Sequence, residues 1–132
     1  MKVMYTGDFT TKCEFQDGSY TVYTQAHAEE GEKIVAYNPM EMLALSVSAC
    51  MLSMIGVAAK THGFSVKDMY ANPSIELQEN PLRLAKLNVE IHIPAGDITE
   101  KHKRFITAAA NACPVGLSIH EGVEKNVTYI YE

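Results

Sequence analysis

The stretch that decides the fold runs from Asn38 to Gly63 and reads NPMEMLALSVSACMLSMIGVAAKTHG. Asn38 suits the cap before a helix, because its side chain can accept from the free backbone N–H groups of the first turn. Pro39 suits the first helical position, and Glu41 stands where a capping-box acid bonds back to the cap. Gly63 can take the left-handed conformation that ends helices. The sequence therefore predicts one helix from Pro39 to about His62.

Residues 42–59 of this helix carry no charge, and their number reaches the lower limit of a membrane-spanning length. Three serines and a glycine dilute the segment, and no cluster of lysine or arginine precedes it. The neighbouring segments look like half-buried strands of a water-soluble fold. We therefore expect a core helix rather than a membrane span, with part of its apolar surface shared with a partner subunit.

Strand patterns lie on both sides of this helix, and they are recognised by alternation and β-branched composition. The expected strands are residues 11–16, 19–24, 33–37, 64–78, 86–93 and 125–131. Asp17-Gly18 predicts a hairpin turn, because both residues tolerate positive φ. A second helix is expected from about Thr99 to Cys113, because Pro114 cannot lie inside it. This mixture of elements predicts an α+β fold.

The size and charge of the chain exclude several classes of protein. With 132 residues the chain is large enough for one domain with its own core, so we expect a single domain over residues 1–132. A net charge of −5 argues against a nucleic-acid partner. The N-terminal residues contain no apolar run of signal-peptide length, so the reducing cytoplasm is the expected location. Three cysteines and five histidines show no metal-ligand spacing, and no metal or cofactor is expected.

Two of the three cysteines have a context that points to chemistry. Cys50 lies in the middle of the first helix on an apolar face, where a single cysteine is most simply a small core residue. Cys113 lies at a helix end before Pro114, and the negative end of a helix dipole raises the pKa of a thiol. By position Cys113 is therefore a resolving thiol rather than an attacking thiolate, and activating Cys50 would need a nearby cation. Cys13 has no such context and is interpreted as structural.

Residues 38–50, with the sequence NPMEMLALSVSAC, and residues 113–120, with the sequence CPVGLSIH, resemble the two cysteine motifs of the OsmC/Ohr family of thiol peroxidases. The resemblance covers nearly the whole chain in element order. It implies an intertwined homodimer in which β-sheet wraps long central cysteine helices. It also implies that Cys50, as peroxidatic residue, attacks an organic hydroperoxide and becomes a sulfenic acid, which condenses with the resolving Cys113. A dithiol, often lipoyl-based and carried on a lipoylated protein, then reduces the disulfide.

The chain departs from the well-studied peroxidases of this family at two points. Those proteins carry an N-terminal arginine that holds the thiolate and pairs with a glutamate, whereas residues 1–82 contain no arginine here. Their glutamate directly follows the proline, where this chain has Met40. Glu41 lies nine positions before Cys50, on about the opposite helix face and about 13 Å along the axis. Glu41 is therefore a candidate catalytic residue, with a helix cap as the favoured interpretation.

Three functions remain open from the sequence. The first is the two-cysteine peroxidase, in which Lys12 or Lys33 could replace the missing cation. The second is a non-catalytic or slow dimer of the same fold that responds to redox state or binds a ligand. The third is acyl or thiol transfer by Cys50, with His62 or His120 as base, although a turn histidine in contact with solvent explains His120 more simply.

Overall fold

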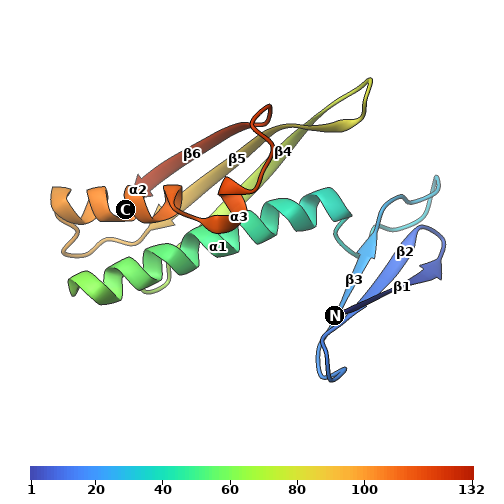
Figure 1. Cartoon of the computed structure of the whole chain (residues 1–132), viewed down its shortest axis with the longest axis horizontal. Helices are drawn as coiled ribbons and strands as arrows, with labels where there is room; N and C mark the ends of the chain where they lie inside the picture. The colour runs from blue at the N-terminus through green and yellow to red at the C-terminus, as the bar shows by residue number, and fades with distance from the viewer. The chain divides into compact units, whose positions relative to one another are not determined.

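The structure, a computed structural model, describes residues 1–132 and divides into two compact units, Met1–Leu43 and Ala44–Glu132, which are described separately (Figure 1). The chain has the predicted α+β composition, with two three-stranded sheets and one long helix. In chain order the elements are β1 (Lys2–Gly7), β2 (Thr10–Glu14), β3 (Thr21–Gln25), α1 (Pro39–His62), β4 (Tyr70–Gln78), β5 (Arg83–Ile93), α2 (Glu100–Asn111), α3 (Pro114–Leu117) and β6 (Glu124–Tyr131).

The first unit contains an antiparallel sheet in the order β1-β2-β3, and the predicted hairpin forms its β2–β3 pair. The turn between these strands differs from the two-residue turn that the sequence suggested. Gly18 has a φ of 73°, and its N–H donates to the carbonyl of Phe15 over 2.9 Å. Asp17 keeps a negative φ and accepts from the N–H of Ser19. The connection is therefore a longer turn that closes on a left-handed glycine, and only Gly18 needs positive φ.

The strand β1 was not predicted from the sequence. It pairs with β2 through a two-residue connection, Asp8-Phe9, in which both residues have positive φ, 50° and 61°. Such a turn matches the natural twist of a hairpin, but it normally contains glycine or asparagine. Phe9 gives no such signal, so this hairpin could not be recognised from the turn residues.

The predicted strand at residues 33–37 is wrong. This segment runs without strand pairing, apart from one bridge between Tyr37 and Thr24. The backbone N–H of Val35 donates instead to the side-chain oxygen of Gln25 over 2.9 Å. A side chain thus replaces the neighbouring strand, which explains why β-branched composition alone misled the prediction.

The helix α1 has the predicted bounds and the predicted ends. The side chain of Asn38 accepts from the N–H of Glu41 over 2.8 Å, and the carboxylate of Glu41 accepts from the N–H of Asn38 over 2.9 Å. At the other end Gly63 has a φ of 74°, and the N–H of Phe64 donates to the carbonyl of Ala59. These bonds satisfy backbone groups that every helix end leaves free.

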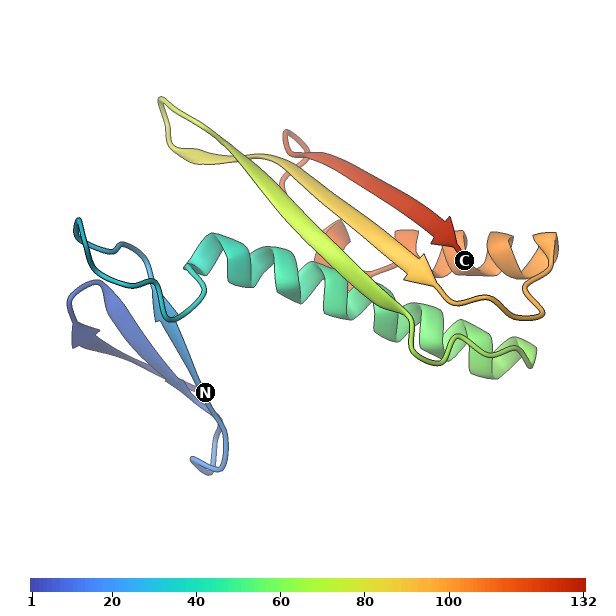
Figure 2. The same ribbon diagram turned by 180° about the vertical axis from the view of Figure 1, so that it is seen from behind.

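The second unit is built on the sheet β4-β5-β6, in which β5 pairs antiparallel with β4 and parallel with β6. Figures 1 and 2 show α1 and α2 on the same side of this sheet. The predicted strands at 86–93 and 125–131 are confirmed and extend slightly further, whereas of residues 64–78 only Tyr70–Gln78 form a strand. Pro73 lies in β4 at the edge of the sheet, where its missing N–H is tolerated.

The core of this unit lies between the sheet and the helices. The predicted alternation in β5 is confirmed, because its inward side chains are at most 2% exposed. They are Leu87, Val89, Ile91 and Ile93. Val47, Met51 and Ile55 of α1 and Ile106 of α2 are buried as well. The buried stripe of α1 therefore faces the sheet, and its packing fixes the orientation of the middle of this helix relative to the sheet.

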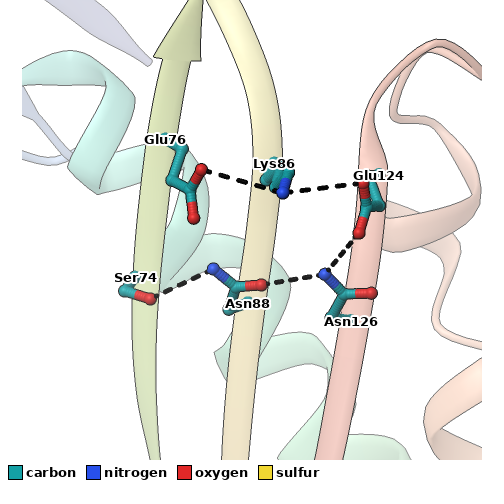
Figure 3. Close-up of polar contacts among 6 residues, drawn as sticks. All are labelled: Ser74, Glu76, Lys86, Asn88, Glu124 and Asn126. Carbon is teal, nitrogen blue, oxygen red and sulfur yellow. Dashed lines mark hydrogen bonds and ion pairs between the residues drawn. The ribbon is translucent and has the colours of Figure 1, made fainter.

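The opposite face of this sheet is polar, and its side chains interact across all three strands (Figure 3). The ammonium group of Lys86 lies 3.9 Å from carboxylate oxygens of both Glu76 and Glu124. Next to this row, the side-chain amide of Asn126 donates to that of Asn88 over 3.0 Å. This face thus has the composition of a surface in contact with water.

The helix α1 is long and apolar enough to cross a membrane by length and composition alone. The core helix of a soluble protein has the same properties, and α1 places a buried face in the core of the second unit. The structure therefore agrees with the interpretation of α1 as a core helix.

Candidate functional site

Cys113 lies between the end of α2 and the start of a one-turn helix. The helix α2 ends at Asn111, and Cys113 caps the one-turn helix α3, whose first residue is Pro114. The sulfur of Cys113 accepts a hydrogen bond from the N–H of Gly116 over 3.3 Å. The sequence indicated only the C-terminus of the preceding helix at this thiol, and the structure adds an N–H donor from the turn that follows it.

Burial raises the pKa of the Cys113 thiol above its usual value, and the neighbouring Cys50 thiol raises it further. The N–H groups of Gly116 and Val115 act in the opposite direction and do not cancel the effect of burial. The side chain of Cys113 is only 1% exposed. Cys113 is thus held as a protonated thiol near neutral pH, as expected from the sequence but for a different physical reason.

The two cysteines of the predicted pair come together within the second unit. The Cys113 thiol donates to the carbonyl oxygen of Val47 over 3.8 Å, one helical turn before Cys50 on α1. Cys50 is half-buried, whereas Val47 and Met51 beside it are buried. Both cysteines are free thiols. The site is therefore a thiol pair in apolar surroundings, with one partner more accessible than the other.

Glu41 lies in the first unit, where its carboxylate is bonded to the backbone of the helix cap. Lys12 lies in the same unit and forms an ion pair with Glu14 over 2.8 Å. Lys33 is exposed in the segment that follows β3. Cys13 is half-buried in β2. The structure thus assigns a local structural contact to Glu41 and to Lys12.

The two histidines considered as bases are both engaged locally. The ring nitrogen Nδ1 of His120 accepts from the N–H of Gly122 over 2.8 Å, so His120 stabilises a turn. The ring of His62 stacks on Phe105, with ring centroids 3.6 Å apart. No group of three or more histidine, cysteine or acidic side chains is placed to hold a metal ion.

Lys125 was missed by the sequence analysis. Its ammonium group donates to the carbonyl of Gly116 over 2.8 Å, and the N–H of the same Gly116 bonds to Cys113. Lys125 stands opposite Leu87 in the register of β5 and β6, so it belongs to the side of the sheet that carries the helices. In the sequence, Lys125 falls on the same side of the strand as Val127 and Tyr129, and a lysine at that position, although exposed in the structure, was the signal that could have revealed it.

The family model for OsmC-like proteins matches residues 28–128. The chain therefore belongs to the OsmC-like family, which confirms the resemblance drawn from the two cysteine motifs. A comparison with curated proteins gives no match.

Solved structures of bacterial proteins share this fold over nearly the whole chain. A protein from Psychrobacter arcticus, described as an osmotic-stress-induced and detoxification-response protein, is 26% identical, with a TM-score of 0.88 over 97% of this chain and 93% of the other. The organic hydroperoxide resistance protein OsmC from Legionella pneumophila is 22% identical, with a TM-score of 0.75 over 98% and 93%. The organic hydroperoxide resistance protein OhrB of Bacillus subtilis is 18% identical, with a TM-score of 0.69 over 97% and 96%.

Proposed function

We propose that this chain is a thiol peroxidase that reduces organic hydroperoxides through a two-cysteine cycle. The observation that carries the proposal is the position of the Cys113 thiol, which lies against α1 one turn from Cys50. Family membership supports it, because relatives of the same fold are described as organic hydroperoxide resistance proteins. The apolar surroundings of the two thiols suit a hydroperoxide with a hydrocarbon group.

In the proposed first step, the thiolate of Cys50 attacks an oxygen of the hydroperoxide. The O–O bond breaks, Cys50 becomes a sulfenic acid, and the departing alkoxide takes up the proton that the Cys50 thiol had released, so an alcohol leaves. In the second step the sulfur of Cys113 attacks the sulfur of this sulfenic acid, so a disulfide forms and water leaves. A dithiol then reduces the disulfide by exchange and becomes a cyclic disulfide itself. A lipoyl group on a partner protein has the chemistry for this role.

The different environments of the two thiols support this division of roles. Cys113 is buried and its pKa is raised, so it remains protonated and poorly accessible to peroxide. Cys50 is half-buried and is the more accessible of the two. A sulfenic acid formed on Cys50 would then lie next to the Cys113 thiol, which burial has kept reduced. Free thiols of this kind suit a reducing compartment, and we place the protein in the cytoplasm.

Apolar side chains that one copy leaves exposed support a homodimer. Val57 on α1 is 62% exposed, and Ile34 and Val35 in the first unit are 73% and 76% exposed. Ile34 and Val35 are adjacent, and neighbouring exposed apolar side chains occur at surfaces that bind another protein. We propose a second copy of the chain as this partner. Light scattering should give twice the mass of the chain, and a monomer at micromolar concentration would contradict the proposal.

A second candidate is a slow member of the family that responds to redox state or binds a ligand. The observation that favours it is that residues 1–82 contain no arginine, and that the ammonium group of Lys125 donates to the carbonyl of Gly116 rather than to the sulfur of Cys50. A peroxidase normally surrounds its attacking thiol with a cation that stabilises the thiolate. The rate of reaction with hydroperoxide separates this candidate from the peroxidase.

Peroxide consumption in the presence of a dithiol tests the proposed function. Wild type and Cys13→Ser should consume cumene hydroperoxide with dihydrolipoamide as reductant, because Cys13 lies outside the thiol pair. Cys50→Ser should consume none above the rate of the dithiol alone. If Cys50→Ser is as active as wild type, the two-cysteine cycle is wrong. A wild-type rate equal to that of a free thiol would favour the slow alternative.

A further inference from the structure

The helix α3 is a single turn whose two sides carry contacts to different elements. Its capping residue, Cys113, reaches α1 through the carbonyl of Val47. Its third residue, Gly116, is buried and bonds through its N–H to the sulfur of Cys113. The carbonyl of Gly116 accepts from the ammonium group of Lys125 on β6. The position of the thiol relative to α1 therefore depends on a turn that is also fixed to the sheet.

The bond from Lys125 to the carbonyl of Gly116 is shorter than the bond that this carbonyl accepts from the backbone of Ile119. The ammonium group donates over 2.8 Å, whereas the N–H of Ile119 donates over 3.3 Å. The backbone of Gly116 lies beside the thiol, since a methyl group on it would be in ordinary contact, at 3.7 Å, with both the sulfur of Cys113 and the end of Met51. A movement of Gly116 therefore moves the N–H that bonds to the sulfur.

We propose that Lys125 is a positioning residue for the Cys113 thiol: its ammonium group holds Gly116, and thereby keeps the Gly116 N–H on the sulfur. Lys125 does not touch the sulfur in this role. Its contribution to turnover rests on the proposed function, but its effect on the thiol can be measured without peroxide.

The role follows from what the resolving step requires. As the sulfur of Cys113 attacks the sulfenic sulfur of Cys50, the S–O bond breaks, and the proton of Cys113 leaves with the hydroxyl group as water. Negative charge develops on the sulfur of Cys113 during this loss of the proton. A hydrogen bond from an N–H strengthens when its acceptor becomes charged. Keeping the Gly116 N–H in place therefore favours the reactive form of Cys113.

The first experiment measures the pKa of Cys113 from thiolate absorbance in the full chain with Cys13→Ser and Cys50→Ser. Lys125→Met should raise this pKa by about one unit, a tenfold smaller thiolate fraction. Lys125→Arg, which retains a donor of similar reach, should restore the wild-type value. Lys125→Ala, which also lacks a donor, replaces the methionine variant if that one does not fold. An unchanged pKa in Lys125→Met would overturn the proposal.

Two controls separate positioning from simple loss of charge. Lys86→Met removes a lysine from the adjacent strand, but on the polar face where Figure 3 shows it between Glu76 and Glu124, and should leave the pKa of Cys113 unchanged. The second control is Lys125→Gln, which keeps an N–H donor without the charge. A Cys113 pKa nearer to wild type than to Lys125→Met supports positioning, and a pKa equal to that of Lys125→Met contradicts it.

The second experiment is a single turnover with cumene hydroperoxide in the chain with both active cysteines. Lys125→Met should slow disulfide formation about tenfold while sulfenic acid forms on Cys50 at the wild-type rate. Equal rates of disulfide formation in both proteins would count against Lys125. If wild type forms no sulfenic acid at all, the proposed function is wrong, and the titration still decides the role of Lys125.

Discussion

Substitution of Glu41 separates a capping role from a catalytic one. Its carboxylate accepts from the N–H of Asn38, and its own N–H donates to the side chain of Asn38, so both bonds of a capping box are present. The substitution Glu41→Gln keeps an acceptor oxygen but removes a negative charge near the helix N-terminus. Such a charge contributes about 0.5 kcal/mol to the unfolding free energy. Glu41→Ala also removes the acceptor, and the loss should reach about 1 kcal/mol, similar to Asn38→Ala.

The assay combines urea unfolding, followed by circular dichroism, with hydroperoxide consumption on the same preparations. If Glu41 is a cap, Glu41→Gln should lose about 0.5 kcal/mol of unfolding free energy and keep a rate within about twofold of wild type. Glu41→Ala and Asn38→Ala should be destabilised to a similar extent and retain activity at low temperature. If Glu41→Gln consumes hydroperoxide about tenfold or more slowly than wild type but has the same unfolding free energy, the capping interpretation is refuted and Glu41 has a catalytic role.

Two further predictions concern the second unit. Ile55→Ala should lower the unfolding free energy by about 2–5 kcal/mol in urea unfolding, because Ile55 is fully buried, whereas Ser53→Ala on the exposed side of α1 should change it by less than about 0.5 kcal/mol. Hydrogen bonds from His92 to Glu132 and Glu90 raise its pKa above 6.5. The protonated His92 therefore stabilises the folded protein fully below pH 6.5, and this contribution is lost as the pH rises through the raised pKa. The melting temperature of wild type should exceed that of His92→Gln by more at pH 6 than at pH 9.

These predictions have clear contrary outcomes. Equal destabilisation by Ile55→Ala and Ser53→Ala would mean that the buried face of α1 is assigned wrongly. A difference between wild type and His92→Gln that grows from pH 6 to pH 9 would mean that the histidine is not stabilised in its protonated form.

The features that the sequence predicted best depend on neighbouring residues alone. Asn38, Glu41 and Gly63 determine the ends of α1 through bonds within a few positions, so their chemistry can be read directly. The alternation in β5 was equally clear, because one face of that strand is buried and the other is polar. The pair of cysteine motifs led to the family for a related reason, since both motifs are short and contiguous.

The features that were missed depend on residues far apart or on backbone geometry. The turn at Asp8-Phe9 has positive φ without glycine, and the segment before Tyr37 is held by a side chain rather than by a strand. The parallel pairing of β5 with β6 has no local sequence signal. The same holds for the Gly116 N–H that bonds to Cys113, because every residue except proline carries such a donor.

The measurement that tests the central claim most directly is the mass of the reduced protein after one equivalent of an organic hydroperoxide. Wild type should lose two hydrogens as Cys50 and Cys113 form a disulfide. Cys113→Ser should instead carry a sulfenic acid on Cys50 that a dimedone probe traps, and Cys50→Ser should stay unchanged. A wild type that remains reduced, while a known thiol peroxidase in the same tube is oxidised, would contradict the claim.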